Sequence, residues 1–125
     1  MKNEPIWIDV DVTGELTGEK YFGRFSIKRY LTHTERSEAV RLAETLMRGI
    51  QQDVNFRTLL SSIAFLNVHI VESDAKWWTG EDVKGLDLLD EAPIWAISKQ
   101  LYNAQKPDTE EGVDKPAPEE PKKKK

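Results

Sequence analysis

Two histidines and one acidic stretch are the side chains in this 125-residue chain that could hold a metal ion or move a proton. His33 and His69 are far apart in the sequence and have no third ligand at metal-binding spacing. The acidic stretch consists of Asp82, Asp87, Asp90 and Glu91. It lacks the dense alternating oxygen donors of a calcium-binding loop. We therefore expect structural or surface roles for these residues, and neither a metal nor a cofactor.

Sequence motifs for covalent catalysis or phosphate binding are also missing. The chain contains no cysteine, which excludes disulfides, thiolate nucleophiles and Cys-ligated zinc. It has neither a phosphate-binding glycine loop nor the nucleophile elbow of a hydrolase. Asp9 and Asp11 are close enough for paired-carboxylate chemistry, but their alternation with apolar residues is typical of the wet face of a strand. The sequence thus predicts a protein that is not an enzyme.

An adjacent pair of tryptophans, Trp77 and Trp78, is the remaining candidate for a functional site. Neighbouring side chains point in different directions in a strand or a helix, so one ring can be buried while the other stays partly exposed and anchors a partner. In the alternative, both rings pack beneath the loop at 85–89 and need no partner.

The elements that must position these residues begin with a predicted β-hairpin. Apolar and polar residues alternate over 6–12 and again over 20–31, and a glycine-containing turn at 13–18 separates the two runs. Antiparallel pairing of the runs brings opposite charges together, and such pairs fix the register. The facing charges are Asp9 and Asp11 on one strand and Lys20, Arg24 and Lys28 on the other.

A helix is predicted after the hairpin. Thr32 and Glu35 have the spacing of a capping box, and Gly49 is suited to the end of the helix. The apolar residues between them recur at helical spacing and are Ala39, Val40, Ala43, Leu46, Met47 and Ile50.

A second helix is predicted from near Asn55. Its inward-facing residues are Leu59, Leu60, Ile63, Ala64 and Leu66. From Leu66 apolar residues recur at every second position, so we prefer a helix that runs into a short strand within 66–72 and adds a third strand to the sheet. A continuous helix to Val71 is the alternative, because short apolar runs do not distinguish the two.

A last helix is predicted after an ordered loop at 85–90 that is anchored by its leucines. Asp90 is placed to cap this helix, and Pro93 is tolerated in a first turn. Its apolar face consists of Ile94, Ile97, Leu101 and Tyr102, with Trp95 at one edge.

The composition predicts one domain followed by a tail. Residues 106–125 are rich in Pro, Glu, Asp and Lys and have almost no apolar area to bury, so we expect a disordered tail. Residues 1–105 are expected to form a single α+β domain, in which an N-terminal antiparallel β-hairpin packs against about three α-helices.

Charge and hydropathy narrow the class of partner. The charges of the tail cancel, so the net charge of −4 lies on residues 1–105, which does not favour nucleic-acid binding. No run approaches the ~20 apolar residues of a membrane span, and the first residues do not form a signal peptide. We expect a cytoplasmic protein that binds neither nucleic acid nor membrane.

The order of features resembles the tail assembly chaperones of tailed bacteriophages. The segments that carry the resemblance are GEKYFGRFSIKRYLT, an amphipathic helix, LLSSIAFLNVHIVES, the tryptophan pair and GLDLLDE before a final helix. Together they span residues 8–103. The chain departs from the family at 73–76, where relatives often carry a proline before the tryptophans.

The resemblance implies a non-enzymatic protein of the host cytoplasm. It would self-associate and coat the long helices of the tape measure protein, or bind another tail protein, during tail assembly. The candidate contact residues are Leu59, Ile63, Leu66, Trp77, Trp78 and Trp95. A ribosomal frameshift in the codons of Lys122–Lys125 would yield a longer product, and a plain charged tail is the alternative. The alternative functions are a structural virion component, such as a small head, neck or tail protein, and a host-directed regulatory binding protein.

Overall fold

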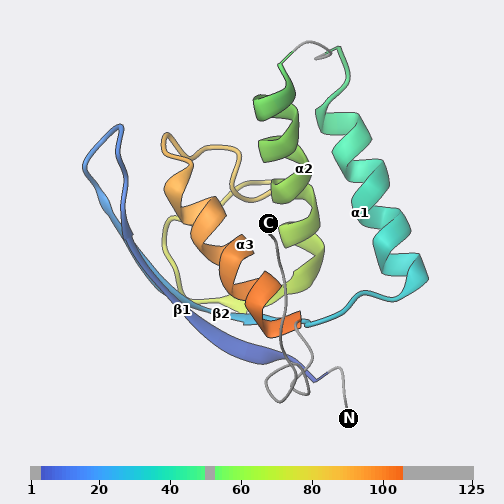
Figure 1. Ribbon diagram of the computed structural model, residues 1–125, viewed down its shortest axis with the longest axis horizontal. Coiled ribbons are helices and arrows are strands. Elements are labelled where there is room, and N and C mark those ends of the chain that lie inside the picture. The colour runs from blue at the N-terminus through green and yellow to red at the C-terminus, as the bar shows by residue number, and fades with distance from the viewer. Residues whose placement is uncertain (1–3, 50–52, 106–125) are drawn as a thin grey trace, which may run out of the picture.

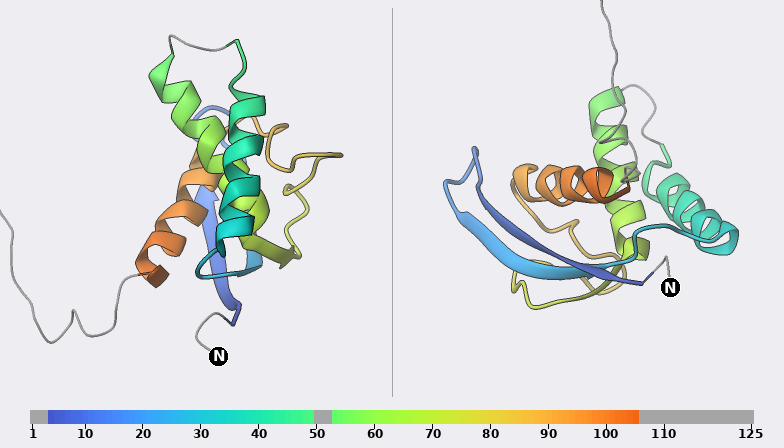
Figure 2. Two further views of the ribbon diagram at one scale, coloured as in Figure 1. Left: turned by 90° about the vertical axis from the view of Figure 1, so that its right-hand side faces the viewer. Right: turned by 60° about the horizontal axis from the view of Figure 1, so that its bottom comes forward.

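The computed structural model describes residues 4–49 and 53–105. The elements along the chain are β1 (Ile6–Thr13), β2 (Lys20–Ile27), α1 (His33–Leu46), α2 (Val54–His69), β3 (Ile70–Ser73) and α3 (Ala92–Gln105) (Figure 1). The strands form an antiparallel sheet in the order β1-β2-β3, and the helices lie on one side of the hairpin (Figure 2). The predicted α+β class, with its hairpin, third strand and three helices, is confirmed.

The hairpin has the register that the charge pattern predicts. Asp9 lies opposite Arg24, and the Arg24 Nε donates to Asp9 Oδ1 at 3.2 Å. The Arg24 guanidinium also lies 5.0 Å from the ring centroid of Trp7. Ile8 and Val10 point the other way and are buried, as an alternating strand requires.

The predicted end of the second hairpin strand is wrong. β2 ends at Ile27 and not at Leu31, because Lys28 leaves the sheet and pairs with Glu35 at the start of α1. Asp11 and Lys20 lie opposite Phe22 and Thr13, so neither has an opposite charge directly across the hairpin. Of the predicted cross-strand charge pairs, the one between Asp9 and Arg24 is therefore formed.

The core lies between the sheet and the helices. Its fully buried side chains come from both β-strands of the hairpin and from α2 and α3: Val10, Phe25, Ile27, Leu66, Ile94 and Ile97. α3 packs over β1, whereas α1 packs against α2. Burial of this apolar surface is the main favourable term in the stability of the domain.

The capping box of α1 is confirmed. Thr32 Oγ1 accepts from the Glu35 N–H, while the Glu35 carboxylate accepts from the Thr32 N–H. The predicted apolar stripe was too wide, because α1 buries only small side chains against α2 and leaves Val40 40% exposed. Gly49 follows the helix with φ of 81°, and Ile50 lies outside the described residues.

α2 runs directly into β3, so the preferred interpretation of 59–72 is confirmed and the continuous helix to Val71 is wrong. The boundary lies later than the alternation indicated, since Leu66 and Val68 are helical and the strand begins at Ile70. The backbone of Lys28 fixes this junction, because its N–H donates to His69 O at 2.8 Å and its carbonyl accepts from the His69 ring.

Three details of the last third differ from the prediction. Asp90 does not cap α3, because its carboxylate binds the hairpin turn instead. Leu86 and Leu89 are exposed, so the loop is anchored by Leu88 and not by all its leucines. Tyr102 is also exposed, although Ile94, Ile97 and Leu101 form the buried face of α3 as predicted.

The predicted tail at 106–125, with Lys122–Lys125, lies outside the described residues. Within the part of the chain that the structure describes, no helix has the length and apolar character needed to cross a membrane.

Candidate partner-binding surface

The tryptophan pair joins the sheet to the loop that follows it. Trp78 is buried and meets Phe25 edge to face, with ring centroids 5.9 Å apart. Trp77 is half-buried, and its Nε1–H donates to Phe22 O at 3.0 Å. The Trp77 ring also packs on Phe25, with ring centroids 5.4 Å apart, so both rings contact the core and Trp77 alone stays partly exposed.

Gly85 makes room for the buried ring. A Cβ at this position would lie 2.8 Å from Trp78 Cζ3, and the φ of Gly85 is +98°. Both the close approach and the dihedral favour glycine. Trp78 thus packs beneath the loop.

The predicted contact residues divide into three groups by exposure. Ile63, Leu66 and Trp78 are buried in the core and offer no surface to a partner. Leu59 and Trp77 are half-buried against that core, and Trp95 is exposed. Sequence periodicity identifies apolar residues but does not separate a core position from a surface position.

Five of the exposed apolar side chains line two adjoining hollows, one of which Leu59 also lines. They form what we call the loop surface, which comprises Leu16, Phe56, Leu86, Leu89 and Trp95. Leu16 is 78% exposed and Leu89 69% exposed. Contiguous exposed apolar area of this kind marks interaction sites in soluble proteins.

Two adjoining hollows open on the loop surface. One, of about 240 Å³, lies between α2 and the loop and is lined by Phe56, Leu59 and Leu86. The other, of about 400 Å³, lies between the hairpin turn and the start of α3 and is lined by Leu16 and Trp95. They share Leu89, Asp90 and Glu91. The acids among their lining residues are Glu15, Glu91 and the buried Asp90, with no basic side chain among the described lining residues.

The buried carboxylate of Asp90 holds the hairpin turn in place beside α3. Its Oδ1 accepts from the Leu16 N–H at 2.7 Å and the Thr17 N–H at 3.2 Å. Its Oδ2 accepts from Thr17 Oγ1 at 2.5 Å and from the Tyr21 hydroxyl at 2.8 Å. These bonds tie together residues more than 60 positions apart and set Leu16 beside Leu89.

The hydrogen bonds in this cluster favour the ionised form of the Asp90 carboxylate. The hydrogen bond from Thr17, with those from Tyr21 and the turn amides, holds the pKa of Asp90 below its ordinary value of 3.8. Burial, together with the hydrogen bond to Asp90, raises the pKa of Tyr21. The carboxylate stays ionised and the phenol stays protonated at neutral pH, which is what a structural clamp needs.

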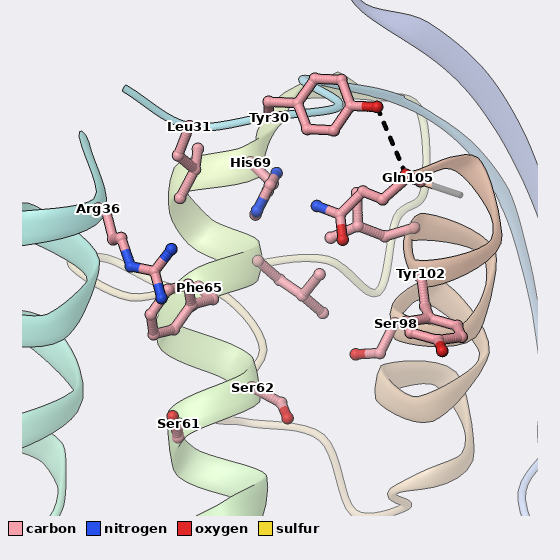
Figure 3. Close-up of a pocket in the computed structure, with 12 residues that line it drawn as sticks. Tyr30, Leu31, Arg36, Ser61, Ser62, Phe65, His69, Ser98, Tyr102 and Gln105 are labelled. Atoms are coloured by element: carbon pink, nitrogen blue, oxygen red, sulfur yellow. Dashed lines mark hydrogen bonds between the residues drawn. The ribbon is translucent and has the colours of Figure 1, made fainter. Parts of the chain in front are cut away.

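A third hollow, of about 650 Å³, separates α2 from α3 (Figure 3). Its lining is mixed, with Phe65 and Tyr102 beside Arg36 and the hydroxyls of Ser61, Ser62 and Ser98. One end is closed by Tyr30, whose hydroxyl donates to Gln105 O at 3.4 Å. We refer to it as the α2–α3 groove.

His69 forms part of the wall of the α2–α3 groove and is only 5% exposed. Its Nδ1 lies 2.6 Å from Lys28 O, and because a carbonyl can only accept, Nδ1 carries the proton. Burial lowers the pKa of His69 below its ordinary value of 6.5. The ring is thus neutral and holds the α2–β3 junction.

No metal site accompanies these side chains. Within 4–49 and 53–105, no three His, Cys, Asp or Glu residues come together in a way that could hold a metal ion. His33 lies at the first position of α1, and His69 lies at the last position of α2. Asp82 and Asp87 are exposed, whereas Asp90 is buried in the turn.

Comparison with known proteins adds no family to this description. No family model matches the chain, and neither a curated protein nor a solved structure matches it.

Of the residues on the loop surface, sequence reasoning had named only Trp95 and the neighbouring Leu59. The signal for the others was present, since Leu16 is an apolar residue in a glycine-containing turn and Leu86 and Leu89 stand in a polar loop. An apolar side chain in such a segment has no regular core position to fill.

Proposed function

We propose that this protein is a non-enzymatic tail assembly chaperone of a tailed bacteriophage, which binds the tape measure protein in the host cytoplasm during tail assembly. The resemblance of its sequence features supplies the class. The observation that carries the proposal is the loop surface, where exposed leucines and a tryptophan border two adjoining hollows.

The shape and composition of the loop surface suit an amphipathic helix. Such a helix presents apolar side chains at i, i+3, i+4 and i+7, which can seat in a row of shallow hollows. Removal of each exposed leucine from water contributes roughly 1.5–3 kcal/mol when burial is complete. A chaperone must also release its client, so a few partly buried anchors serve it better than one deep pocket.

The acidic side chains beside the hollows favour basic residues on either side of the apolar stripe of the client helix. Glu15 and Glu91 border the hollows beside Leu16 and Trp95. A client helix with lysine or arginine next to its apolar stripe would be favoured over one with acidic flanks. Self-association is part of the proposal, because several weak sites along one long client multiply their effect.

Co-expression with the tape measure protein tests the proposal. The wild-type chain should raise the soluble fraction of the client, measured by centrifugation and gel densitometry. The double variant Leu16→Ser/Leu89→Ser should lose most of this effect, since loss of two apolar anchors weakens binding by about tenfold or more. Both side chains are exposed, so the variant should keep the melting temperature of the wild type.

A matched control is Val40→Ser/Val71→Ser, which removes two exposed apolar side chains from α1 and β3. This control should rescue the client as the wild type does. Equal rescue by the Leu16/Leu89 variant would contradict the assignment of the loop surface. Mass spectrometry that finds the protein in purified virions would instead favour a structural virion component.

A further inference from the structure

β1 is an edge strand, since the sheet order places it at one side of β2 with no further strand beyond it among the described residues. Its hydrogen bonds show which backbone groups face that side. The carbonyl of Asp9 accepts from the side chain of Gln100 on α3 and so points away from β2. Gly14, an odd number of positions further on, donates to Glu19 O across the hairpin at 2.8 Å.

In an antiparallel strand the N–H and C=O of one residue point to the same side, and the side alternates along the chain. Trp7, Asp9, Asp11 and Thr13 therefore direct their backbone groups to the free edge of β1. The residues between them bond to β2. Of the groups at the free edge, the Asp9 carbonyl is already bound by the Gln100 side chain, so a strand added at this edge would replace that bond and pair with the remaining donors and acceptors.

The opposite edge of the hairpin is already covered by the chain itself. Beyond β3, Arg24 O accepts from the Asp74 N–H at 3.3 Å and the Arg24 N–H donates to Asp74 Oδ1 at 2.9 Å. The Trp77 ring covers Phe22 O. The other edge strand of the sheet is β3, which has 4 residues against 8 in β1, so the β1 side offers the longer template for strand addition.

The side chains on the free edge decide which strand can be added. Asp9 and Asp11 lie on the face of the sheet away from the core, and the Asp9 side chain is 78% exposed. Asp11 lies opposite Phe22 and has no basic residue directly across from it. A strand laid along β1 meets these two carboxylates at neighbouring positions on one face.

A second copy of this chain is a poor match for the edge. If two β1 strands pair antiparallel over nearly their full length, with their helices on the same face, Asp9 of one copy lies opposite Asp9 or Asp11 of the other. Like charges directly across a pair are destabilising. The acids thus oppose self-pairing and favour a strand of opposite charge.

We propose that the free edge of β1 is a second binding site, which takes up an extended segment of a partner protein with lysine or arginine at every second position and apolar residues between them. The main-chain bonds supply affinity and the paired charges supply register and selectivity. This site goes beyond the proposed chaperone function and does not depend on the loop surface.

Two synthetic peptides test the proposal, one that alternates valine with lysine and one that alternates valine with glutamate. The lysine peptide should slow amide hydrogen exchange at Trp7, Asp9 and Asp11 and bind about tenfold tighter than the glutamate peptide. Asp11→Lys, which leaves the bond between Asp9 and Arg24 in place, should reduce the preference. Equal binding of both peptides, or no protection along β1, would overturn the proposal.

A proline separates strand addition from simple charge attraction. Asp11→Pro removes an N–H that faces the free edge and leaves the bonds to β2 in place, as prolines on edge strands do. Asp11→Ala removes the same charge and keeps the N–H. Proline should weaken binding of the lysine peptide by about tenfold relative to alanine, since main-chain bonds carry the affinity.

Equal binding by the Pro and Ala variants would overturn the proposal, because charge alone would then explain the affinity. Sedimentation of the wild type without peptide tests whether a second copy of the chain occupies the free edge of β1. A dimer that Asp11→Pro abolishes would show that a second copy takes the edge, which also overturns the proposal.

Discussion

At the scale of single residues, Asp90 does the most to shape the candidate surface. Its carboxylate accepts from two turn amides and two hydroxyls, and an ionised carboxylate is suited to this because it only accepts. Gly14 is matched to it, since a Cβ there would lie 2.1 Å from Asp90 Oδ2. The clamp and the glycine together set the position of Leu16.

We predict that Asp90→Ala lowers the melting temperature by several degrees and weakens client binding, because the turn that carries Leu16 loses its anchor. The pH dependence has a defined sign. The pKa of Asp90 is lower in the folded chain than its ordinary value of 3.8, so its contribution is complete above that value and is lost as the pH falls through the folded pKa.

Urea unfolding of the wild type and Asp90→Ala across acidic pH measures this contribution. The stability difference between the two should shrink as the pH falls below about 4. Asp87→Ala, a change of an exposed acid in the same loop, serves as the control and should leave the melting temperature unchanged. A difference that stays constant at all pH values would show that the carboxylate charge plays no part.

His69 carries a second prediction at this scale. Burial lowers its pKa below 6.5, so the unfolded chain binds a proton more readily. The stabilisation is therefore complete above pH 6.5 and decreases as the pH falls through the folded pKa. His69→Asn should flatten the stability profile in this window, because an asparagine amide can still donate to Lys28 O but does not titrate.

Chemical denaturation between about pH 5 and 7 measures the two profiles. His33→Asn is the matched control, since His33 is exposed at the start of α1, and its profile should keep the wild-type slope. An unchanged slope in His69→Asn would rule out the buried neutral ring as the source of the pH dependence.

At the scale of elements, local patterns predicted the types correctly and the boundaries less well. The capping box at Thr32 and the alternation of β1 depend on neighbouring residues, and both were found as predicted. The end of α2 depends on Lys28, 41 positions away from His69. Leu66, Val68 and Ile70 stand at every second position, as in a strand, but Leu66 and Ile70 are also four residues apart, as on one face of a helix. The local sequence therefore does not fix that boundary.

Gly85 gives a prediction about the loop that supports the loop surface. Gly85→Ala should destabilise the domain by about 1–3 kcal/mol, because the new methyl meets Trp78 and the dihedral is unfavourable for alanine. Gly49→Ala is the matched control, with φ of +81° and no atom within 4 Å of the added Cβ. It should cost only the dihedral term, about 1 kcal/mol.

Equilibrium unfolding in urea measures both variants. A Gly85→Ala variant no less stable than Gly49→Ala would show that the loop shifts freely away from Trp78. Loss of stability together with loss of client rescue would link the loop to the proposed contact.

At the scale of the whole molecule, the sequence predicted the fold class but only part of the candidate surface. Hydrophobic periodicity finds the core, and so it also drew Ile63 and Leu66 into the list of contact residues, whereas Trp78 entered that list as one of the tryptophan pair and is buried as well. Leu16 and Leu89 come from separate segments that meet only because Asp90 binds the hairpin turn. That contact spans 74 positions, and a single sequence carries no local sign of it.

The arrangement of the molecule also separates its two proposed sites. The loop surface lies at the hairpin turn and the starts of α2 and α3, whereas the free edge of β1 runs along the sheet (Figure 1). One protein could therefore bind a helix at the first site and an extended strand at the second.

The most direct measurement of the proposed function is an NMR titration of the ¹⁵N-labelled protein with a helical peptide from the tape measure protein that has an apolar stripe and basic flanks. We predict the largest amide shifts at Leu16, Leu89 and Trp95, and their loss in Leu16→Ser/Leu89→Ser. Shifts centred on His69 and Ser98 in the α2–α3 groove, or no shifts at saturating peptide, would contradict the assignment.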